Sequence, residues 1–166
     1  MTLLQKIKLD LKANKNNSKG RWIVVSYRIA NHIHYSSNIL VKIFGFPFRK
    51  LYSWIFIWLI GIEIPEDTVI GVGLQVWHGS GLVVNHKTII GDNVLLRHCT
   101  TLGNKFLGSG VPKIGNNVEI GSQSVLIGDI EIGDNVTIGA GSIVTKSIPA
   151  NCIAFGNPAK YKLKTT

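Results

Sequence analysis

Aliphatic residues recur at every sixth position in the C-terminal half of the chain. A period of six matches neither the 3.6-residue turn of a helix nor the alternation of a long strand. It is typical of a solenoid, in which each short repeat forms one flat face of a coil and stacks on the coil below. Three such faces would close a triangular coil. The positions are Ile114, Ile120, Leu126, Ile132, Ile138 and Val144.

Glycine comes directly after four of these six aliphatic residues, and the turn-forming dipeptides Asn116-Asn117 and Asp134-Asn135 stand in the same register. Both residue types tolerate the positive φ that a sharp corner needs, so we expect the glycine or asparagine after each short strand to form a corner. The glycines are Gly115, Gly121, Gly133 and Gly139.

The register opens at Ile64 and is broken twice. Two extra residues stand between Val76 and Val84, and residues 104–111 lack an aliphatic residue at the expected position. Insertions in a rigid repeat array are where function tends to be placed. The pattern therefore predicts a β-helix over residues 62–150 with a loop at 104–111, and a tail over 151–166.

Residues 1–61 carry helical rather than six-residue spacing. We expect helices with a break near Ser36-Ser37, and an element that ends or starts at Pro47. The segment from Leu51 to Ile62 is almost wholly apolar, but its uninterrupted apolar run, Trp54 to Ile62, is too short to span a bilayer and is flanked by charged residues. It is predicted to pack on the start of the β-helix or on a neighbouring subunit, or to lie in the bilayer interface.

The formal charge of +9 belongs to the N-terminal region: residues 1–61 hold ten Lys and Arg against the single acid Asp10, whereas residues 62–166 hold eight of each sign. No nucleic-acid motif accompanies this charge. A basic, aromatic region favours peripheral contact with an anionic membrane surface, with a solvated helical cap as the alternative. Cys99 and Cys152 lack disulfide or metal spacing and no secretory signal is visible, so we expect a cytoplasmic protein, with a peripheral position at the inner membrane face left open.

His78 stands in the first irregular segment, and Glu63 precedes it by fifteen residues, close to one full coil. An imidazole that titrates near neutrality can remove a proton from a hydroxyl, and a carboxylate can orient it. A histidine that merely fills a loop is the plainer alternative.

The six-residue pattern over residues 62 to 160 resembles the hexapeptide-repeat acyltransferases. The resemblance implies a left-handed parallel β-helix, a homotrimer, and acetyl-CoA bound as co-substrate in a groove between neighbouring subunits, flanked by the loop at 104–111. The positions that match the cofactor contacts of that family are Ser122, Ala140, Thr145, Lys146 and Lys160.

The segment from Glu63 through His78 to Val84 is similar to that of serine acetyltransferases, which implies His78 as general base and Glu63 as its orienting acid. Two departures argue against free serine as acceptor: Trp77 replaces an acid, and Gly110-Val111 replaces an Arg-His pair.

An aromatic side chain suits stacking on a sugar, and the run from Leu96 to Lys105 resembles colanic-acid and capsule-biosynthesis O-acetyltransferases. The resemblance thus implies acetylation of a saccharide or glycan hydroxyl, with Trp77, His98 and Asn104 at the acceptor. Serine O-acetylation and a non-catalytic assembly or membrane-docking module are the alternatives. Three histidines on a β-helix also suggest γ-class carbonic anhydrases, but that family's close histidine pair is absent, so we predict no catalytic metal.

Overall fold

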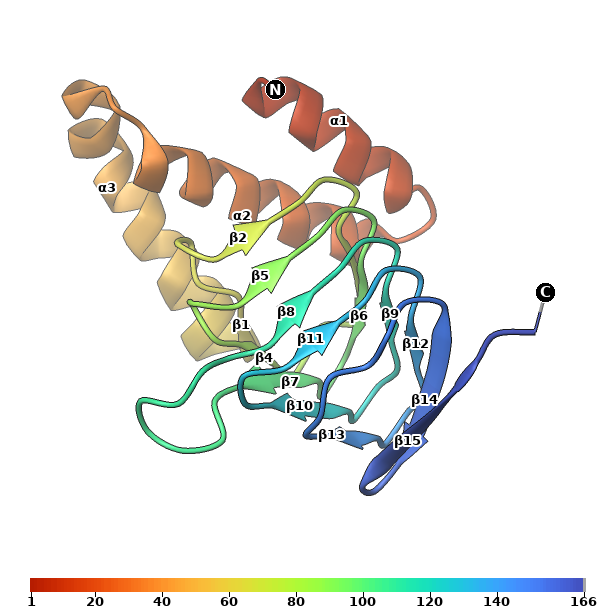
Figure 1. Cartoon of the computed structure of the whole chain (residues 1–166). Coiled ribbons are helices and arrows are strands. Elements are labelled where there is room, and N and C mark those ends of the chain that lie inside the picture. Colours follow the sequence, from red (N-terminus) through yellow and green to blue (C-terminus); the bar gives the residue numbers. More distant parts are fainter. Residues whose placement is uncertain (166) are drawn as a thin grey trace.

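The computed structural model describes residues 1–165, in which a helical N-terminal region leads into a parallel β-helix (Figure 1). Three sheets form the three faces of the β-helix. Face A consists of β1 (Ile62–Glu63), β4 (Leu82–Val84), β7 (Thr101–Gly103), β10 (Val125–Ile127) and β13 (Ile143–Val144). Face B consists of β2 (Val69–Ile70), β5 (Ile89–Ile90), β8 (Lys113–Ile114) and β11 (Glu131–Ile132). Face C consists of β3 (Gln75–Trp77), β6 (Leu95–Arg97), β9 (Glu119–Ile120), β12 (Thr137–Ile138), β14 (Cys152–Gly156) and β15 (Ala159–Leu163).

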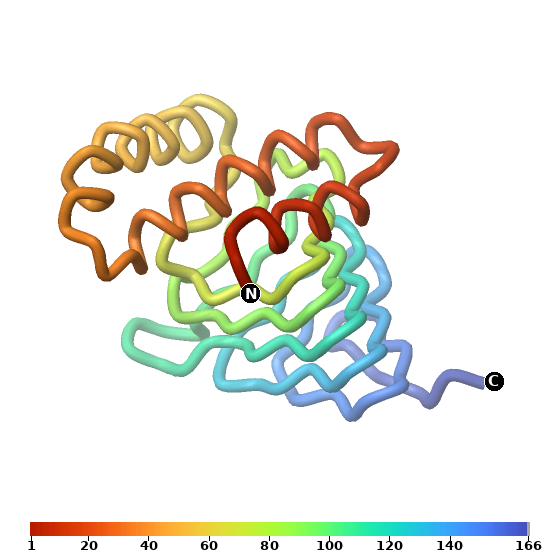
Figure 2. Tube along the Cα trace, turned by 90° about the horizontal axis from the view of Figure 1, so that it is seen from above, coloured from red at the N-terminus to blue at the C-terminus, as the bar shows by residue number. Residues whose placement is uncertain are grey.

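The chain descends from face to face in about five coils. Seen from above, the coils run counterclockwise as they recede from the helices, which makes the β-helix left-handed (Figure 2). The predicted fold class is therefore confirmed. The final strand, β15, turns back and pairs antiparallel with β14 at the lower edge of face C.

Strand pairing locates both irregularities. Regular coils repeat every 18 residues, as in the pairing of Val125 with Ile143. The interval from Ile62 to its partner Leu82 is 20, which places two extra residues at the corner between β3 and β4. The interval from Ile89 to Lys113 is 24, because the loop after β7 adds six residues. Both breaks lie where the sequence predicted them.

The aliphatic positions point inward and form one continuous core, from Ile64 in the first coil to Val144 in the last. The asparagine corners are confirmed, since Asn117 and Asn135 have φ of 55° and 59°. The prediction for the glycines was wrong, because none of the four has a positive φ. They are needed for close approach instead: a Cβ on Gly121 would lie 2.4 Å from the backbone nitrogen of Ala140 in the next coil.

The N-terminal region forms α1 (Leu3–Ala13), α2 (Ser18–Tyr35), α3 (Ile39–Ser53) and a π-helical continuation, η1 (Trp54–Ile60). The predicted break at Ser36-Ser37 separates α2 from α3. Pro47 lies inside α3, so the expectation that an element ends or starts there was wrong. Its ring is exposed, while Phe48 beside it packs against the core and supports the helix.

These helices cover the open end of the first coil, where a solenoid needs a cap. Backbone carbonyls that no earlier coil can pair accept hydrogen bonds from helix side chains. The Tyr27 hydroxyl donates to the carbonyl of Thr68 (2.7 Å), and the Tyr52 hydroxyl to that of Ile64 (2.7 Å). Asn14 and Asn17 donate similarly to Leu74 and Val76, each at 2.7 Å.

A buried ion pair anchors the same cap. Nε of Arg28 lies 2.6 Å from the Asp10 carboxylate, and both side chains are almost fully buried. Arg28 also donates to the carbonyls of Ile70 and Gly71, while Asp10 accepts from the backbone N–H of Gly73 at 2.7 Å. The single acid of the N-terminal region is thus buried inside the structure, and within residues 1–165 none of the lysines of this region forms an ion pair.

Candidate active site

His78 lies at the widened corner between β3 and β4. Its backbone is left-handed, with φ of 67°, and Gly79 and Gly81 share that conformation. Positive φ costs a non-glycine residue energy unless the surroundings impose it. The two extra residues allow this turn, and they leave the His78 side chain exposed at the edge of the β-helix.

A second imidazole lies beside it. Because Trp77 pairs with Arg97, His98 occupies the same corner one coil further down. The rings of His78 and His98 meet edge to face, with centroids 5.6 Å apart. Nδ1 of His98 is buried and makes no hydrogen bond within residues 1–165. This corner therefore carries two adjacent imidazoles, one exposed and one half-buried.

The same corner continues downward through two of the predicted cofactor positions. The pairing of Leu96 with Ile120, and of Ile120 with Ile138, places Ser122 below His98 and Ala140 below Ser122. An open groove of 350 Å³ runs along this edge, and Ser122 and Ala140 both line it. The predicted base and part of the predicted cofactor site are therefore aligned along one edge of the β-helix.

Arg97 lines the same groove, and the sequence reasoning missed it. It is an exposed residue at the end of β6, next to Trp77 in the neighbouring strand. Its guanidinium makes no ion pair among the described residues. The position of Arg97 directly before His98 in the sequence could have indicated it. Its place beside Trp77, however, follows only from the 20-residue interval of the first coil.

The remaining cofactor positions divide between two corners. Lys160 pairs with Phe155, whose Cβ lies against Gly139, so Lys160 continues the edge of Ser122 and Ala140. Thr145 and Lys146 follow β13 and lie at the far side of face A. One subunit alone does not bring all five positions into a single groove.

Glu63 lies on the outer side of β1, opposite Val83 of β4. It lines a shallow hollow of 280 Å³ on face A together with Asn104, one of the predicted acceptor residues. Within residues 1–165 no hydrogen bond joins the Glu63 carboxylate to the His78 imidazole. Both residues belong to the first coil, and the role of Glu63 as orienting acid stays a prediction.

The loop at 104–111 projects from the corner between β7 and β8, as Figure 1 shows at its lower left. Asn104 donates through Nδ2 to the carbonyl of Phe106 (2.8 Å), and the Ser109 hydroxyl accepts from the backbone N–H of Lys105 (2.9 Å). These hydrogen bonds within the loop hold its conformation. Leu107 at the tip is 97% exposed and contributes nothing to the core.

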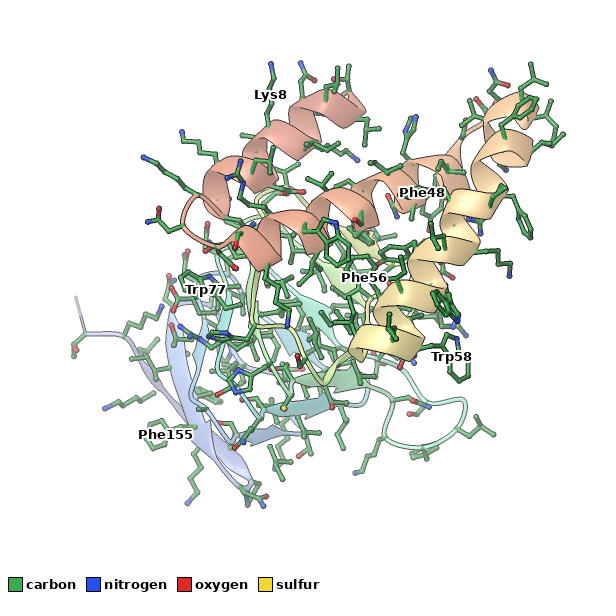
Figure 3. All side chains as sticks on the ribbon, turned by 180° about the vertical axis from the view of Figure 1, so that it is seen from behind. Lys8, Phe48, Phe56, Trp58, Trp77 and Phe155 are labelled. Carbon is green, nitrogen blue, oxygen red and sulfur yellow. The ribbon has the colours of Figure 1, made fainter. Side chains whose placement is uncertain are left out.

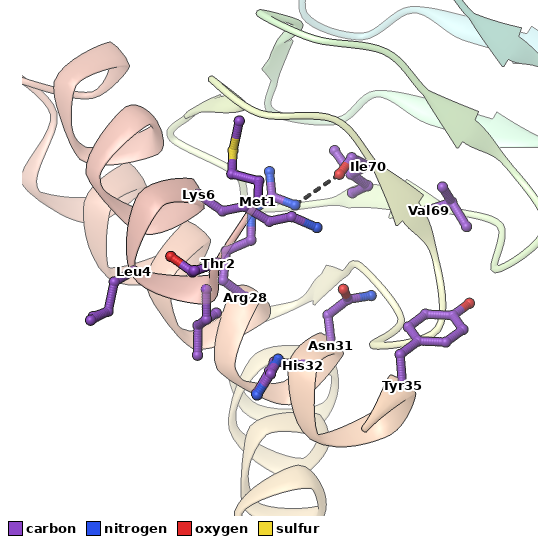
Figure 4. A pocket seen from close by; sticks show the side chains of 11 residues that line it. Met1, Thr2, Leu4, Lys6, Arg28, Asn31, His32, Tyr35, Val69 and Ile70 are labelled. Carbon is purple, nitrogen blue, oxygen red and sulfur yellow. Dashed lines mark hydrogen bonds between the residues drawn. The ribbon is translucent and has the colours of Figure 1, made fainter. Parts of the chain in front are cut away.

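A larger cavity, of 750 Å³, lies between the start of α1, α2 and β2 (Figure 4). Its polar groups include Arg28, which is committed to Asp10 and to the carbonyl of Ile70. The cavity lies at the capped end of the β-helix rather than at the corner of His78, and we assign it no part in the chemistry. The part of the chain that the structure describes contains no cluster of three or more His, Cys, Asp or Glu suited to a metal ion.

The chain is similar in sequence to known acetyltransferases. A family model, bacterial transferase hexapeptide (six repeats), matches residues 112–146. The putative colanic acid biosynthesis acetyltransferase WcaB of Escherichia coli K12 is 35% identical over 157 residues, covering 93% of this chain and 97% of that protein. The serine acetyltransferase of Helicobacter pylori is 37% identical over 143 residues, covering 85% of this chain and 80% of that protein.

Solved structures of serine acetyltransferases have a similar fold. Serine acetyltransferase of Neisseria gonorrhoeae superposes with a TM-score of 0.79 at 29% identity, covering 98% of this chain and 67% of that one. The Brucella abortus enzyme, solved in complex with coenzyme A, gives a TM-score of 0.80 at 28% identity, covering 98% and 68%. The β-helix and these similarities place the chain in one class of enzymes, the hexapeptide-repeat transferases. This chain belongs to the hexapeptide-repeat acetyltransferase family, and it is an acetyltransferase.

Proposed function

We propose that this protein transfers the acetyl group of acetyl-CoA to a hydroxyl of a saccharide or glycan precursor. The relative named for colanic acid biosynthesis supports this acceptor class, because the match spans nearly the whole of both chains. The observation that carries the proposal is the aromatic Trp77 directly beside the exposed His78, where an aromatic face can stack on a sugar ring.

His78 is the general base in this proposal. Its imidazole accepts the proton of the acceptor hydroxyl, so that the oxygen can attack the thioester carbonyl. As the tetrahedral intermediate collapses, the C–S bond breaks, and the imidazolium returns the proton to the leaving CoA thiolate, which gives the acetyl ester and free CoA. Holding both substrates in the groove adds the advantage of proximity. Glu63 would hold the imidazole in the productive tautomer, which requires a side-chain movement on binding, since the two groups make no hydrogen bond in the described structure.

The groove below His78 fits an extended, phosphate-bearing substrate. Ser122 and Ala140 line it together with Arg97, whose positive charge suits a phosphate, and with the acid Glu119. Lys160 lies further along the same edge, on β15, and supplies a second cation there. Thr145 and Lys146 lie at another corner, so they would complete the site only from a neighbouring subunit. This arrangement supports a homotrimer, and sedimentation equilibrium checks it: a monomeric active enzyme would exclude the shared groove.

Serine is the second candidate acceptor. The serine acetyltransferases among the relatives support it, and exposed Arg97 beside Trp77 could hold a carboxylate as well as a phosphate. A CoA-release assay with neutral sugars, nucleotide sugars, glycans and L-serine separates the two candidates. We expect release with a saccharide and only background with L-serine. Rapid release with L-serine would overturn the acceptor class while leaving the base in place.

A non-catalytic role is the third candidate. The role of Glu63 in catalysis is tested by Glu63→Gln. Glu131→Gln is the matched surface control, because Glu131 lies on face B in an exposed pair with Lys113. We expect Glu63→Gln to lower kcat about a hundredfold and Glu131→Gln to leave it unchanged. No CoA release from the parent protein with any acceptor would favour the passive role.

A further inference from the structure

The helix formed by α3 and η1 is apolar on both sides. Its inner side packs on α2 and the first coil: Phe56 is buried, and its ring centroid lies 4.6 Å from that of Trp22 and 4.9 Å from that of Tyr52. Yet only 11% of the most apolar 18-residue window of the helix from Ile39 to Ile60 is buried. A helix that is apolar all round normally lies in a protein core or against lipid.

The outer side carries a row of large apolar side chains at helical spacing, which we call the exposed stripe. Trp58 is 81% exposed, Phe44 79% and Leu40 59%. Figure 3 shows Trp58 pointing away from the protein, whereas Phe56 points inward. Contiguous exposed apolar surface of this kind marks an interaction site. The exposed stripe consists of Leu40, Ile43, Phe44, Leu51, Trp54 and Trp58.

Positive charge flanks the exposed stripe. Lys42 and Lys50 are exposed on the same helix, and residues 39–60 contain no acid. Lys42 and Arg49, with Ile43 and Phe46 between them, line a surface hollow of 350 Å³. Nζ of Lys50 lies 5.3 Å from the centre of the Phe46 ring. Cations beside apolar and aromatic side chains are the surface that anionic lipid headgroups bind.

We propose that the exposed stripe lies in the interface of an anionic phospholipid bilayer, with Lys42 and Lys50 at the headgroup phosphates. Charge favours this occupant over a second copy of the chain. A symmetric pairing of two such faces would bring two sets of cations together without an acid to offset them. Trp54 and Trp58 lie at the end of the stripe, and tryptophan is favoured at the boundary between water and acyl chains.

The helix meets the length and composition of a membrane span, but its inner side is held by the protein. The Tyr52 hydroxyl donates to the carbonyl of Ile64, and Arg49 pairs with Glu66 at 2.8 Å. Spanning would break these contacts and place Lys42, Arg49 and Lys50 in hydrocarbon. Lying in the interface keeps all of them, and it would hold the capped end of the β-helix at the membrane surface.

Vesicle co-sedimentation of the full chain tests the proposal, with vesicles of phosphatidylcholine alone and of phosphatidylcholine mixed with phosphatidylglycerol. We expect binding to the anionic vesicles. The double variant Trp54→Gln/Trp58→Gln should weaken partitioning by about tenfold or more, because two large apolar groups no longer leave water. Phe155→Gln is the matched control: that side chain is 55% exposed at the other end of the β-helix, and the change should leave vesicle binding as it is.

The variant Lys42→Gln/Lys50→Gln separates charge from apolar contact. It should weaken binding to anionic vesicles by about fivefold for each residue and lose most of the salt dependence. Equal binding of the parent protein and the tryptophan double variant would overturn the proposal. A failure of the parent protein to bind either vesicle would overturn it as well. If the tryptophan variant then formed a smaller oligomer than the parent in sedimentation equilibrium, the exposed stripe would be assigned to a second copy of the chain.

Discussion

The imidazole rings of His78 and His98 meet edge to face across adjacent coils, with centroids 5.6 Å apart and an angle of 80° between their planes. The pairing of Trp77 with Arg97 enforces this contact, because it stacks the two corners in register. His98 is therefore placed to limit the rotation of His78 and to define the floor on which an acceptor would rest.

Replacement of His98 tests this positioning role. His98→Ala should lower kcat about tenfold while the KM for acetyl-CoA changes little, since a freed His78 ring spends less time aimed at the hydroxyl. His98→Phe should restore most of the rate, because it keeps an aromatic edge contact. Steady-state kinetics of both variants checks this; a phenylalanine variant as slow as the alanine variant would mean that His98 acts through its nitrogens instead.

The buried pair of Asp10 and Arg28 should dominate the attachment of the helical cap. Arg28→Met leaves Asp10 buried without its partner, and we expect the free energy of unfolding to fall by about 3–5 kcal/mol. Arg49→Met removes a pair with Glu66 in which each side chain is 23% exposed to solvent, and it should cost less, about 1 kcal/mol. Urea denaturation of the two variants gives the comparison, and equal losses would contradict the cap as described.

The cap should also detach at alkaline pH. Burial raises the pKa of Tyr27 and of Tyr52 well above the ordinary value, chiefly because the charged phenolate would be desolvated. A folded-state pKa above the unfolded one contributes stability that is complete below pH of about 10 and is lost as pH rises beyond it. Thermal melting across this range should show the decline.

Tyr27→Phe isolates one phenol. It should cost about 1 kcal/mol at neutral pH, because the carbonyl of Thr68 still accepts from Nδ2 of Asn31. It should also make the alkaline decline shallower, because one phenol no longer titrates. An unchanged alkaline decline would assign the loss of stability to other groups.

Close approach between coils predicts which glycines are essential. Gly121→Ala would place a Cβ 2.4 Å from the backbone nitrogen of Ala140 and should destabilise the β-helix by about 1–3 kcal/mol. Gly103→Ala meets only Cγ2 of Thr101 at 3.8 Å and should be close to neutral. Urea denaturation distinguishes the two, and equal stability would show that the coils can separate at no cost.

The β-helix was predictable from the sequence because its core is a one-dimensional pattern. Each aliphatic residue from Ile64 to Val144 contacts its equivalents in neighbouring coils, so spacing alone fixes the pairing and both irregular segments. The stacking of Ser122 under His98 follows from the same intervals.

The docking of the helices and the groove beside Arg97 could not be predicted from spacing, because they depend on contacts between distant segments. Nothing in the spacing pairs Asp10 with Arg28, or aims Tyr27 at the carbonyl of Thr68, because these contacts arise only when the helices dock on the first coil. Proline normally ends or kinks a helix, but Pro47 lies inside α3, where the neighbouring Phe48 packs against the core. The groove beside Arg97 required the positions of three strands of face C.

The most direct test of the account is the rate of CoA release by His78→Asn, measured with the saccharide that the parent protein uses best. Asparagine tolerates the left-handed backbone of this position but cannot act as the base. With His78 exposed, the melting temperature should stay close to that of the parent. We predict a kcat lower by about a hundredfold or more. A His78→Asn protein that turns over at the parent rate would contradict the assignment of this imidazole as the base.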